Sequence, residues 1–305
     1  MKIAVIDIGT NSFILMFAKV VGDDIEVLNQ YFEIPQLGDN LMVDNTISYK
    51  AIDNAKVVLK KFREIIENDK VDKVLPIATA VLRQAENSKQ VRKILSEVLG
   101  YEIKVISGDE EARLSYLGAI NSDQNANVID IGGGSSEIIS GKNGNIIYTK
   151  STPIGAVKLQ QRFFPYFKYD LISIDQAIDY IESFLINFDK HPIDFSNELV
   201  GVGGTITTLA HILSGEKAYN PDLIHNYQLE YQRNLDLFSE LISYSPEGLS
   251  KKYNINIKRA RILPAGHLIL IALQEFFDTK PLRVSTYGLR YGILKNFIHN
   301  SFKNN

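Results

Sequence analysis

Residues 127–137 (NVIDIGGGSSE) combine the end of an apolar strand with groups that suit the binding of phosphate and a metal ion. Two acids enclose three glycines and two serines: Asp130, Gly132, Gly133, Gly134, Ser135, Ser136 and Glu137. Glycine lets the backbone adopt positive φ and lets its N–H groups approach an anion closely. The serine hydroxyls are further donors, and carboxylates are ligands that Mg²⁺ takes alongside substrate phosphates. An ordinary glycine-rich hairpin turn with flanking acids is the alternative interpretation.

A second hairpin of the same kind opens the chain at residues 2–20 (KIAVIDIGTNSFILMFAKV). Asp7 lies at the end of its first apolar strand, and a short polar turn separates that strand from the next. The turn consists of Gly9, Thr10, Asn11 and Ser12. Two Asp-Ile-Gly hairpins in one chain are far less expected by chance than one, so together they indicate a paired phosphate-binding device.

The elements around these turns alternate between strands and helices. In the first half, hydrophobic periodicity predicts a third strand over 25–34, a helix from Ser48, a strand over 74–78, a helix over 87–99 ended by Gly100, a strand over 102–106 and a further helix. The second half repeats three strands to residue 151, helices over 156–163 and 174–188, a strand over 198–202, a helix, a long apolar helix over 259–277, a strand over 283–285 and a final helix. Each half therefore has the order βββαβαβα, which predicts a duplicated α/β fold with a cleft between its halves.

The composition restricts the function. The chain has 305 residues, 45% of them hydrophobic and 23% charged, a formal charge of −3 and no cysteine. Disulfides and thiolate sites are excluded, and the overall charge does not favour a nucleic-acid partner. Because no apolar run is long enough to span a membrane and no basic leader precedes the first strand, we expect a cytoplasmic protein without membrane contact.

The chain resembles the Ppx/GppA (exopolyphosphatase and guanosine pentaphosphate phosphohydrolase) phosphatase family, within the sugar kinase, Hsp70 and actin superfamily. The resemblance is carried by AVIDIGTNSF (4–13), ATAVLRQAEN (78–87), ISGDEEARLSYLGA (106–119), VIDIGGGSSE (128–137), GVGGTITTLA (201–210), AGHLIL (265–270) and STYGLRYG (285–292). It implies two actin-like (ribonuclease H-like) domains, over 1–120 and 121–305, that face each other across a cleft. The last helix, about 290–305, either stays with the second domain or packs on the first, and no HD-type C-terminal extension is expected.

The resemblance also implies roles for individual residues. Glu111 is expected to be the general base that activates water, with Asp130 and Glu137 on the opposite side of the cleft and Arg83 among the phosphate-binding residues. We hypothesise that Asp7, Asp130 and Glu137 organise Mg²⁺ or another divalent cation, while the N–H groups of residues 9–12 and 132–136 hold phosphates. Stimulation by a monovalent cation is left open. The alternative for Glu111 is that it only complements the dipole at a helix N-terminus.

Two further groups have alternative interpretations. Gly203, Gly204 and Thr205 follow a strand where kinases of the superfamily hold adenosine, so they either close the base of the phosphate site or form a simple strand-to-helix turn. Lys158, Arg259, Arg261 and Arg290 either line a channel for a longer polyanion or lie on the solvated surface.

The expected function is an exopolyphosphatase, which releases phosphate from the end of inorganic polyphosphate. Conversion of guanosine pentaphosphate (pppGpp) to tetraphosphate, or both activities, is the alternative within the same class. An ATP-dependent kinase or ATPase and a non-catalytic sensor of polyphosphate or the alarmone are alternatives from other classes. A homodimer is compatible with the sequence.

Overall fold

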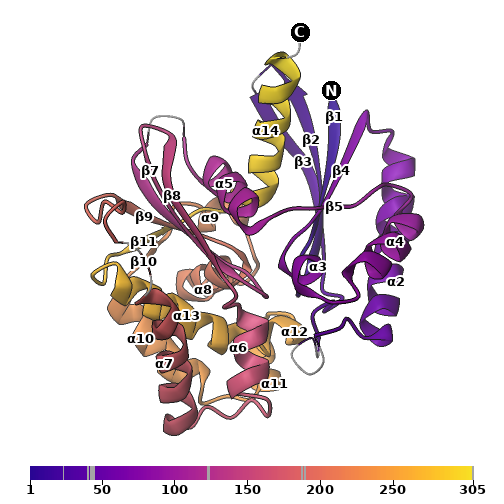
Figure 1. Ribbon diagram of the computed structural model, residues 1–305. Coiled ribbons are helices and arrows are strands. Elements are labelled where there is room, and N and C mark those ends of the chain that lie inside the picture. Colours follow the sequence, from indigo (N-terminus) through magenta and orange to yellow (C-terminus); the bar gives the residue numbers. More distant parts are fainter. Residues whose placement is uncertain are drawn as a thin grey trace. The chain divides into compact units, whose positions relative to one another are not determined.

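The computed structural model describes residues 1–22, 24–39, 41, 45–121, 124–186, 188 and 190–303. The chain divides into two compact units (Figure 1): unit 1 comprises Met1–Gly118 and Leu289–Asn305, and unit 2 comprises Ala119–Gly288. Residues 304 and 305, which the sequence interpretation included in the last helix, lie outside the described residues. Each unit contains a mixed sheet that is covered by helices.

Unit 1 has a five-stranded sheet in the order β3-β2-β1-β4-β5. Its strands are β1 (Lys2–Ile8), β2 (Phe13–Val21), β3 (Asp24–Glu33), β4 (Lys73–Ala78) and β5 (Lys104–Val105). Its helices are α2 (Tyr49–Asp69), α3 (Ala80–Gln84), α4 (Ser88–Leu99), α5 (Gly108–Ala119) and α14 (Leu289–Lys303). The first three strands are antiparallel, whereas β4 and β5 continue the sheet in parallel with β1.

The central strand β1 is buried on both faces. Ala4, Ile6 and Ile8 pack in one hydrophobic cluster with residues of α2 and α4, while Ile3 and Val5 pack in another with residues of α5 and α14. Figure 1 shows α2 and α4 on one side of this sheet and α5 and α14 on the other. Because side chains alternate along a strand, the period of two assigns each residue of β1 to one helix layer.

Local signals in unit 1 determine where its helices begin and end. The Ser48 hydroxyl accepts a hydrogen bond from the Ala51 amide and caps α2. Gly100 adopts φ 82° after α4, a left-handed conformation that glycine takes without strain. Both boundaries were predicted from the sequence and are confirmed.

Unit 2 has a six-stranded sheet in the order β10-β11-β9-β6-β7-β8. Its strands are β6 (Ala126–Ile131), β7 (Ser136–Lys142), β8 (Asn145–Thr152), β9 (Glu198–Val202), β10 (Gln228–Leu229) and β11 (Leu282–Val284). Its helices are α6 (Ala156–Phe163), α7 (Leu171–Leu185), α8 (Gly204–Ser214), α9 (Pro221–Ile224), α10 (Tyr231–Leu241), α11 (Pro246–Tyr253), α12 (Ile257–Ala260) and α13 (Leu263–Phe276). Strands β6, β7, β8, β9 and β11 repeat the order of β1 to β5, so the predicted duplication is confirmed.

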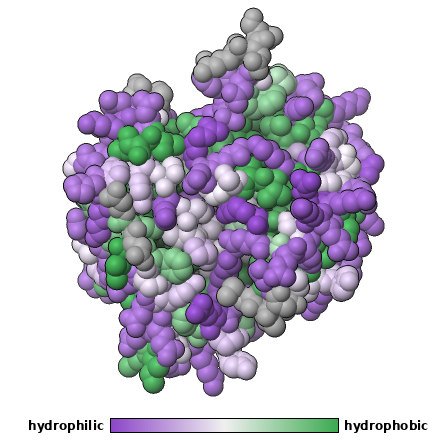
Figure 2. Space-filling model, in the orientation of Figure 1, coloured by the Kyte–Doolittle hydropathy of each residue, from purple (hydrophilic) through white to green (hydrophobic). Residues whose placement is uncertain are grey.

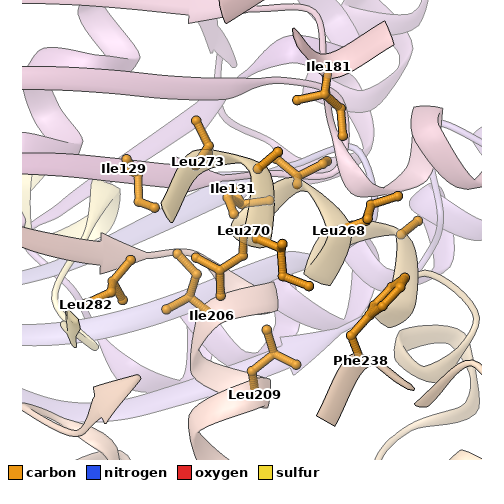
Figure 3. Close-up of a cluster of buried hydrophobic side chains, with 14 of the residues drawn as sticks. Ile129, Ile131, Ile181, Ile206, Leu209, Phe238, Leu268, Leu270, Leu273 and Leu282 are labelled. Atoms are coloured by element: carbon orange, nitrogen blue, oxygen red, sulfur yellow. The ribbon is translucent and has the colours of Figure 1, made fainter. Parts of the chain in front are cut away.

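The core of unit 2 forms around α13 (Figure 3). Leu268, Leu270 and Leu273 from this helix lie with Ile129 and Ile131 from the sheet in one buried cluster. All five side chains are at most 3% exposed. A fully buried leucine or isoleucine contributes roughly 1.5–3 kcal/mol, so this cluster supports the strand that carries Asp130.

One predicted helix is wrong in extent. The sequence interpretation had a single helix over 259–277, but the structure has the short helix α12 and a separate α13 that begins at Leu263. Pro264 occupies the first turn of α13. Proline lacks an amide hydrogen and is favoured at the start of a helix, so the chain restarts there.

On the face drawn in Figure 2, hydrophilic residues separate the groups of hydrophobic ones. Within the described part of the chain, no helix combines the length and the apolar character needed to cross a membrane.

Candidate functional site

The two Asp-Ile-Gly hairpins have the same backbone turn. The Gly9 amide donates to the Ser12 carbonyl at 3.1 Å, and the Gly132 amide donates to the Ser135 carbonyl at 3.0 Å. A Cβ atom added at Gly9 would lie 3.0 Å from the Ser12 carbonyl oxygen, and one added at Gly132 would lie 3.0 Å from the Ser135 carbonyl oxygen. The close approach of the backbone therefore favours glycine at the first position of both turns.

Each turn is held from outside through its carbonyl groups. In unit 1, the carbonyls of Thr10 and Asn11 accept hydrogen bonds from the amides of Gly38 and Gln36. In unit 2, the carbonyls of Gly132 and Gly133 accept from the first amides of α6, those of Ala156 and Val157. Of the amides of residues 9–12 and 132–136 that were predicted to hold phosphate, those of Gly9 and Gly132 are used within the turns, whereas none of these bonds uses the amides of Thr10, Asn11, Gly133 or Gly134.

The glycine loop does not use the positive φ that glycine permits, because Gly132, Gly133 and Gly134 are not among the glycines with positive φ. The loop packs closely against the residue before α6. A Cβ on Gly155, at the start of α6, would lie 2.4 Å from the carbonyl carbon of Gly133 and 2.5 Å from the Gly134 nitrogen. The loop and the chain before α6 thus cross in backbone contact.

The predicted groups of unit 1 lie at one edge of its sheet. Ile8 at the end of β1 is aligned with Ala78 at the end of β4, which in turn is aligned with Val105 at the end of β5. Because these strands are parallel, the segments that follow them begin at the same edge. Those segments are the 9–12 turn, the helix α3 with Arg83 and the helix α5 with Glu111.

Glu111 and Arg83 form the ion pair at this edge. Arg83 donates from Nη1 to Glu111 Oε2 at 2.8 Å and to the Ile106 carbonyl at 3.1 Å. The side chains of Arg83 and Glu111 are only 21% and 10% exposed. Within the described residues Arg83 Nη2 is buried without a hydrogen-bond partner. Arg83 therefore orients Glu111 with one nitrogen and retains a second donor that suits a phosphate oxygen.

Asn11 is a second group whose hydrogen-bonding capacity is not used by the protein. It is 4% exposed, and neither Oδ1 nor Nδ2 has a partner among the described residues. Burial of an unpaired amide costs on the order of 1–3 kcal/mol. A ligand at the turn would provide the missing partners.

Asp7 lies beside Arg290, the second residue of α14. Arg290 Nη1 is 3.5 Å from Asp7 Oδ2, and the side chains are 19% and 17% exposed. Burial raises the pKa of Asp7, while the positive charge of Arg290 lowers it. The sequence interpretation assigned Arg290 only to a channel or to the surface and missed its contact with Asp7, although the motif STYGLRYG contains it.

In unit 2, Asp130 and Glu137 face each other across neighbouring strands. They are direct partners in the antiparallel register of β6 and β7, and Glu137 is also paired with Ser151 of β8. Directly opposite residues have side chains on the same face of a sheet. Glu137 is 1% exposed, and its Oε1 accepts a hydrogen bond of 2.8 Å from the Ser151 hydroxyl. Ser151 was not predicted from the sequence.

Gly203 brings the next turn against Asp130. It precedes α8 with φ 99° and ψ 161°, and an added Cβ would lie 2.8 Å from Asp130 Oδ1 and 2.7 Å from the Ile131 carbonyl oxygen. This position therefore needs glycine for its conformation and for space. The segment is a strand-to-helix turn between β9 and α8, as one of the two interpretations had it. The turn also lies beside Asp130, a predicted site residue.

The other two residues of this turn contact α12 and α13. A Cβ on Gly204 would lie 2.5 Å from Arg259 Nη2, so the guanidinium packs against the N-terminus of α8. Burial lowers the pKa of Arg259 to about 10, which still leaves it charged at neutral pH. Thr205 is 1% exposed and packs against Gly266. A cation at the positive end of a helix is favourable when an anion also binds there.

A divalent cation would need carboxylate ligands from these acids. Across the described residues, no three His, Cys, Asp or Glu side chains gather as a metal site. Mg²⁺ usually takes one or two carboxylates and completes its shell with waters and substrate phosphates. The paired carboxylates of Asp130 and Glu137 fit this mode of binding. A metal site made only of protein ligands would need more side chains than the described residues bring together.

The structure thus gathers the predicted residues in two groups, one in each unit. Unit 1 contains Asp7, Gly9, Thr10, Asn11, Ser12, Arg83 and Glu111, and unit 2 contains Asp130, Gly132, Gly133, Gly134, Ser135, Ser136, Glu137, Gly203, Gly204 and Thr205. Two sheets of the same strand order, each with an Asp-Ile-Gly hairpin, define an actin-like α/β protein. Residues 13–301 match the Ppx/GppA phosphatase family, and the chain belongs to that family.

Individual relatives support this membership. The chain is 29% identical to a guanosine-5'-triphosphate,3'-diphosphate pyrophosphatase of Pseudoalteromonas atlantica, over 99% of this chain and 59% of that protein. It therefore spans about three fifths of the length of this relative. A solved Ppx/GppA structure from Aquifex aeolicus is 29% identical with a TM-score of 0.81, and covers 99% of this chain and 98% of its own. An exopolyphosphatase structure from Cytophaga hutchinsonii is 25% identical with a TM-score of 0.90 and covers 98% of each chain.

Proposed function

We propose that this protein hydrolyses the terminal phosphoanhydride of inorganic polyphosphate and releases phosphate. The observation that carries the proposal is the Arg83–Glu111 pair, a nearly buried carboxylate held at 2.8 Å by an arginine that keeps a free donor. Water must be oriented and deprotonated for such a reaction, and the charge on the transferred phosphoryl group must be stabilised. The pair offers both functions at the same edge of the unit 1 sheet.

In the proposed mechanism Glu111 accepts a proton from the attacking water. Arg83 fixes the Glu111 carboxylate through Nη1 and donates to a phosphate oxygen through Nη2. Within each unit, the amides that the turn itself does not use, those of Thr10 and Asn11 in unit 1 and of Gly133 and Gly134 in unit 2, donate to phosphate oxygens, as does the Asn11 side-chain amide. Fixed donors of this kind stabilise the charge of the transition state without reorganisation.

A divalent cation is part of the proposal. Asp130 and Glu137 of unit 2 would hold Mg²⁺, directly or through waters, and Asp7 of unit 1 would offer a carboxylate to a cation. When bound, the ion would neutralise charge on the phosphates and the leaving oxygen.

Guanosine pentaphosphate is the second candidate substrate. The similarity to the Pseudoalteromonas atlantica pyrophosphatase favours it, whereas the Cytophaga hutchinsonii exopolyphosphatase favours polyphosphate and matches this chain over 98% of both lengths. Both substrates end in the same phosphoanhydride, so the groups described above serve either one.

A phosphate-release assay tests the proposal. It compares short polyphosphate, long polyphosphate, guanosine pentaphosphate and ATP, each with and without Mg²⁺. We expect Mg²⁺-dependent release from polyphosphate at the highest kcat/KM. Faster release from guanosine pentaphosphate would instead support the second candidate.

Two other results would contradict hydrolysis. Absence of release from all four compounds, together with tight binding of one, would indicate a sensor. Phosphorylation of an added acceptor by ATP, without release of free phosphate, would indicate a kinase.

A further inference from the structure

Arg290 is a largely buried arginine whose contacts are long. Its Nη1 lies 3.5 Å from Asp7 Oδ2, and its Nη2 lies 3.5 Å from Gln30 Oε1. Arg290 Nε is buried and has no hydrogen-bond partner within the described residues. An arginine fork usually forms shorter bonds of 2.7–2.9 Å to a carboxylate. Arg290 therefore lies beside the Asp7 carboxylate and can orient it, but it does not form a short bidentate pair with it.

The strand pattern explains why these two residues meet. Ile3 and Val5 of β1 pack with Leu289 and Ile293 of α14 in one hydrophobic cluster. Asp7 follows them at the same period of two and therefore belongs to the same face of the sheet. Helix α14, which follows β11 in the sequence, thus places a cation at the end of the first strand of the chain. Figure 1 shows α14 beside the strands of unit 1.

Helix α14 also holds the helix that carries Glu111. A Cβ added at Gly292 would lie 1.7 Å from the Leu114 carbonyl oxygen, so α14 and α5 are in backbone contact there. Arg113 donates to Asn296 at 2.9 Å, and Lys295 donates to the Leu117 carbonyl at 2.7 Å near the end of α5. One helix therefore touches both the residue expected at the cation and the helix of the expected base.

We propose that Arg290 is a positioning residue, which holds the Asp7 carboxylate at the end of β1 while the rest of α14 fixes α5. The inference rests on the proposed function, in which Asp7 helps to bind the cation. Arg290 acts through Asp7 and does not bind the polyanion itself. Lysine at this position supplies the charge but not the planar fork, so it restores only part of the effect.

A double-mutant cycle tests this role with two readouts. Binding of Mn²⁺ is measured by electron paramagnetic resonance, and the Mg²⁺ dependence of phosphate release is measured with polyphosphate. Loss of a group that orients a metal ligand usually lowers metal affinity by about 10–100-fold. We expect Arg290→Gln to weaken Mn²⁺ binding about tenfold and to raise the Mg²⁺ requirement, and Arg290→Lys to recover part of both.

The cycle separates the two proposals. If Arg290 acts through Asp7, adding Arg290→Gln to Asp7→Asn has little further effect, because residues that act together are not additive. Equal effects in both backgrounds, or a changed KM with unchanged metal binding, would overturn the positioning role. Wild-type protein that binds Mn²⁺ but releases no phosphate would overturn the proposed function, and Mn²⁺ binding would still decide the role of Arg290.

Arg63→Gln is the matched control. Arg63 lies in the same unit and forms an exposed ion pair of 2.7 Å with Glu67. Exposed pairs of this kind contribute little. Mn²⁺ binding and turnover should both stay at the wild-type level, and the midpoint of thermal unfolding of all variants shows whether each one is folded.

Discussion

The two Asp-Ile-Gly hairpins share a backbone but differ in charge. Each has the same turn hydrogen bond, of 3.1 Å in unit 1 and 3.0 Å in unit 2, and each turn is held through its carbonyl groups. The aspartate of unit 1 lies 3.5 Å from an arginine, whereas the aspartate of unit 2 is paired across the sheet with a glutamate. The duplicated fold therefore has the same turn backbone in both units but different side chains around it.

This difference divides the chemistry between the units. Arg290 offsets the negative charge of Asp7, and Arg83 accompanies Glu111. In unit 2, Asp130 and Glu137 place two acids together, which favours a divalent cation. We expect unit 1 to dominate proton transfer and unit 2 to dominate the metal requirement.

Glu111→Gln should have the largest effect on turnover. The amide keeps the shape of the side chain but cannot accept the proton, and loss of a general base usually costs 10²–10⁴-fold. We expect kcat for phosphate release to fall by about a hundredfold or more, with the Mg²⁺ concentration for half-maximal rate unchanged.

Glu110→Gln is the control for that substitution. Glu110 is the preceding residue of α5, and its side chain is 30% exposed and paired with Lys104 at 2.6 Å. Its kcat should remain close to that of the wild type. Equal loss in both variants would mean that α5 needs its acids for helix stability and not for chemistry.

Glu137→Gln should change the metal requirement instead. Glutamine retains an acceptor for the Ser151 hydroxyl, so the fold is preserved while one charge beside Asp130 is removed. We expect the Mg²⁺ requirement to rise by about 10–100-fold and kcat at saturating Mg²⁺ to fall less than in Glu111→Gln. A smaller rise is expected for Asp7→Asn, whose charge Arg290 already offsets, and the opposite order would reverse the division between the units.

The sequence was sufficient for the repeated architecture and for the position of both turns. Short apolar runs located β1 and β6, and the paired Asp-Ile-Gly motifs indicated that the units are duplicates. Local patterns do not show which distant side chains meet. The contacts of Asp7 with Arg290 and of Glu137 with Ser151 depend on how α14 and β8 pack in three dimensions.

The glycines illustrate the same limit. Gly132, Gly133 and Gly134 do not use the positive φ that glycine permits; positive φ occurs at Gly203, and Gly133 and Gly134 are in backbone contact with Gly155. A sequence shows that glycine is present, whereas the reason for glycine depends on what lies beside it. The break before α13 was missed for a related reason, since the apolar residues continue across Pro264.

Gly203→Ala should destabilise the protein by more than its conformation alone explains. A non-glycine residue held in such a φ/ψ region costs roughly 1–3 kcal/mol, and the new methyl group would overlap Asp130 Oδ1 and the Ile131 carbonyl. We expect the free energy of unfolding to fall by about 3 kcal/mol, with a raised Mg²⁺ requirement because Asp130 is displaced.

Gly215→Ala is the control, since Gly215 ends the same helix with φ 73° and nothing within 4 Å of its added Cβ. It should lose only about 1 kcal/mol in denaturant unfolding, and equal losses would show that Asp130 is not displaced.

The units also differ in how they bury an ionisable group, which predicts opposite responses to acid. Burial raises the pKa of Asp7 in unit 1, so this group favours the folded state more as pH falls through its raised pKa. His267 in unit 2 is 0% exposed, and neither ring nitrogen has a hydrogen-bond partner among the described residues. Burial lowers the pKa of His267 to about 3, so the folded state holds this imidazole neutral.

The stability that His267 contributes in its neutral form is present above its unfolded pKa and is lost as pH falls toward 3. From an unfolded value of about 6.5, the loss between pH 7 and pH 5 is about 2 kcal/mol. His267→Leu keeps an apolar group against Phe238 and should make the free energy of unfolding less dependent on pH by that amount, as measured by urea denaturation at both values. If His267→Leu follows the same pH dependence as the wild type, the imidazole is protonated in the folded state, and unit 2 tolerates a buried charge without a partner.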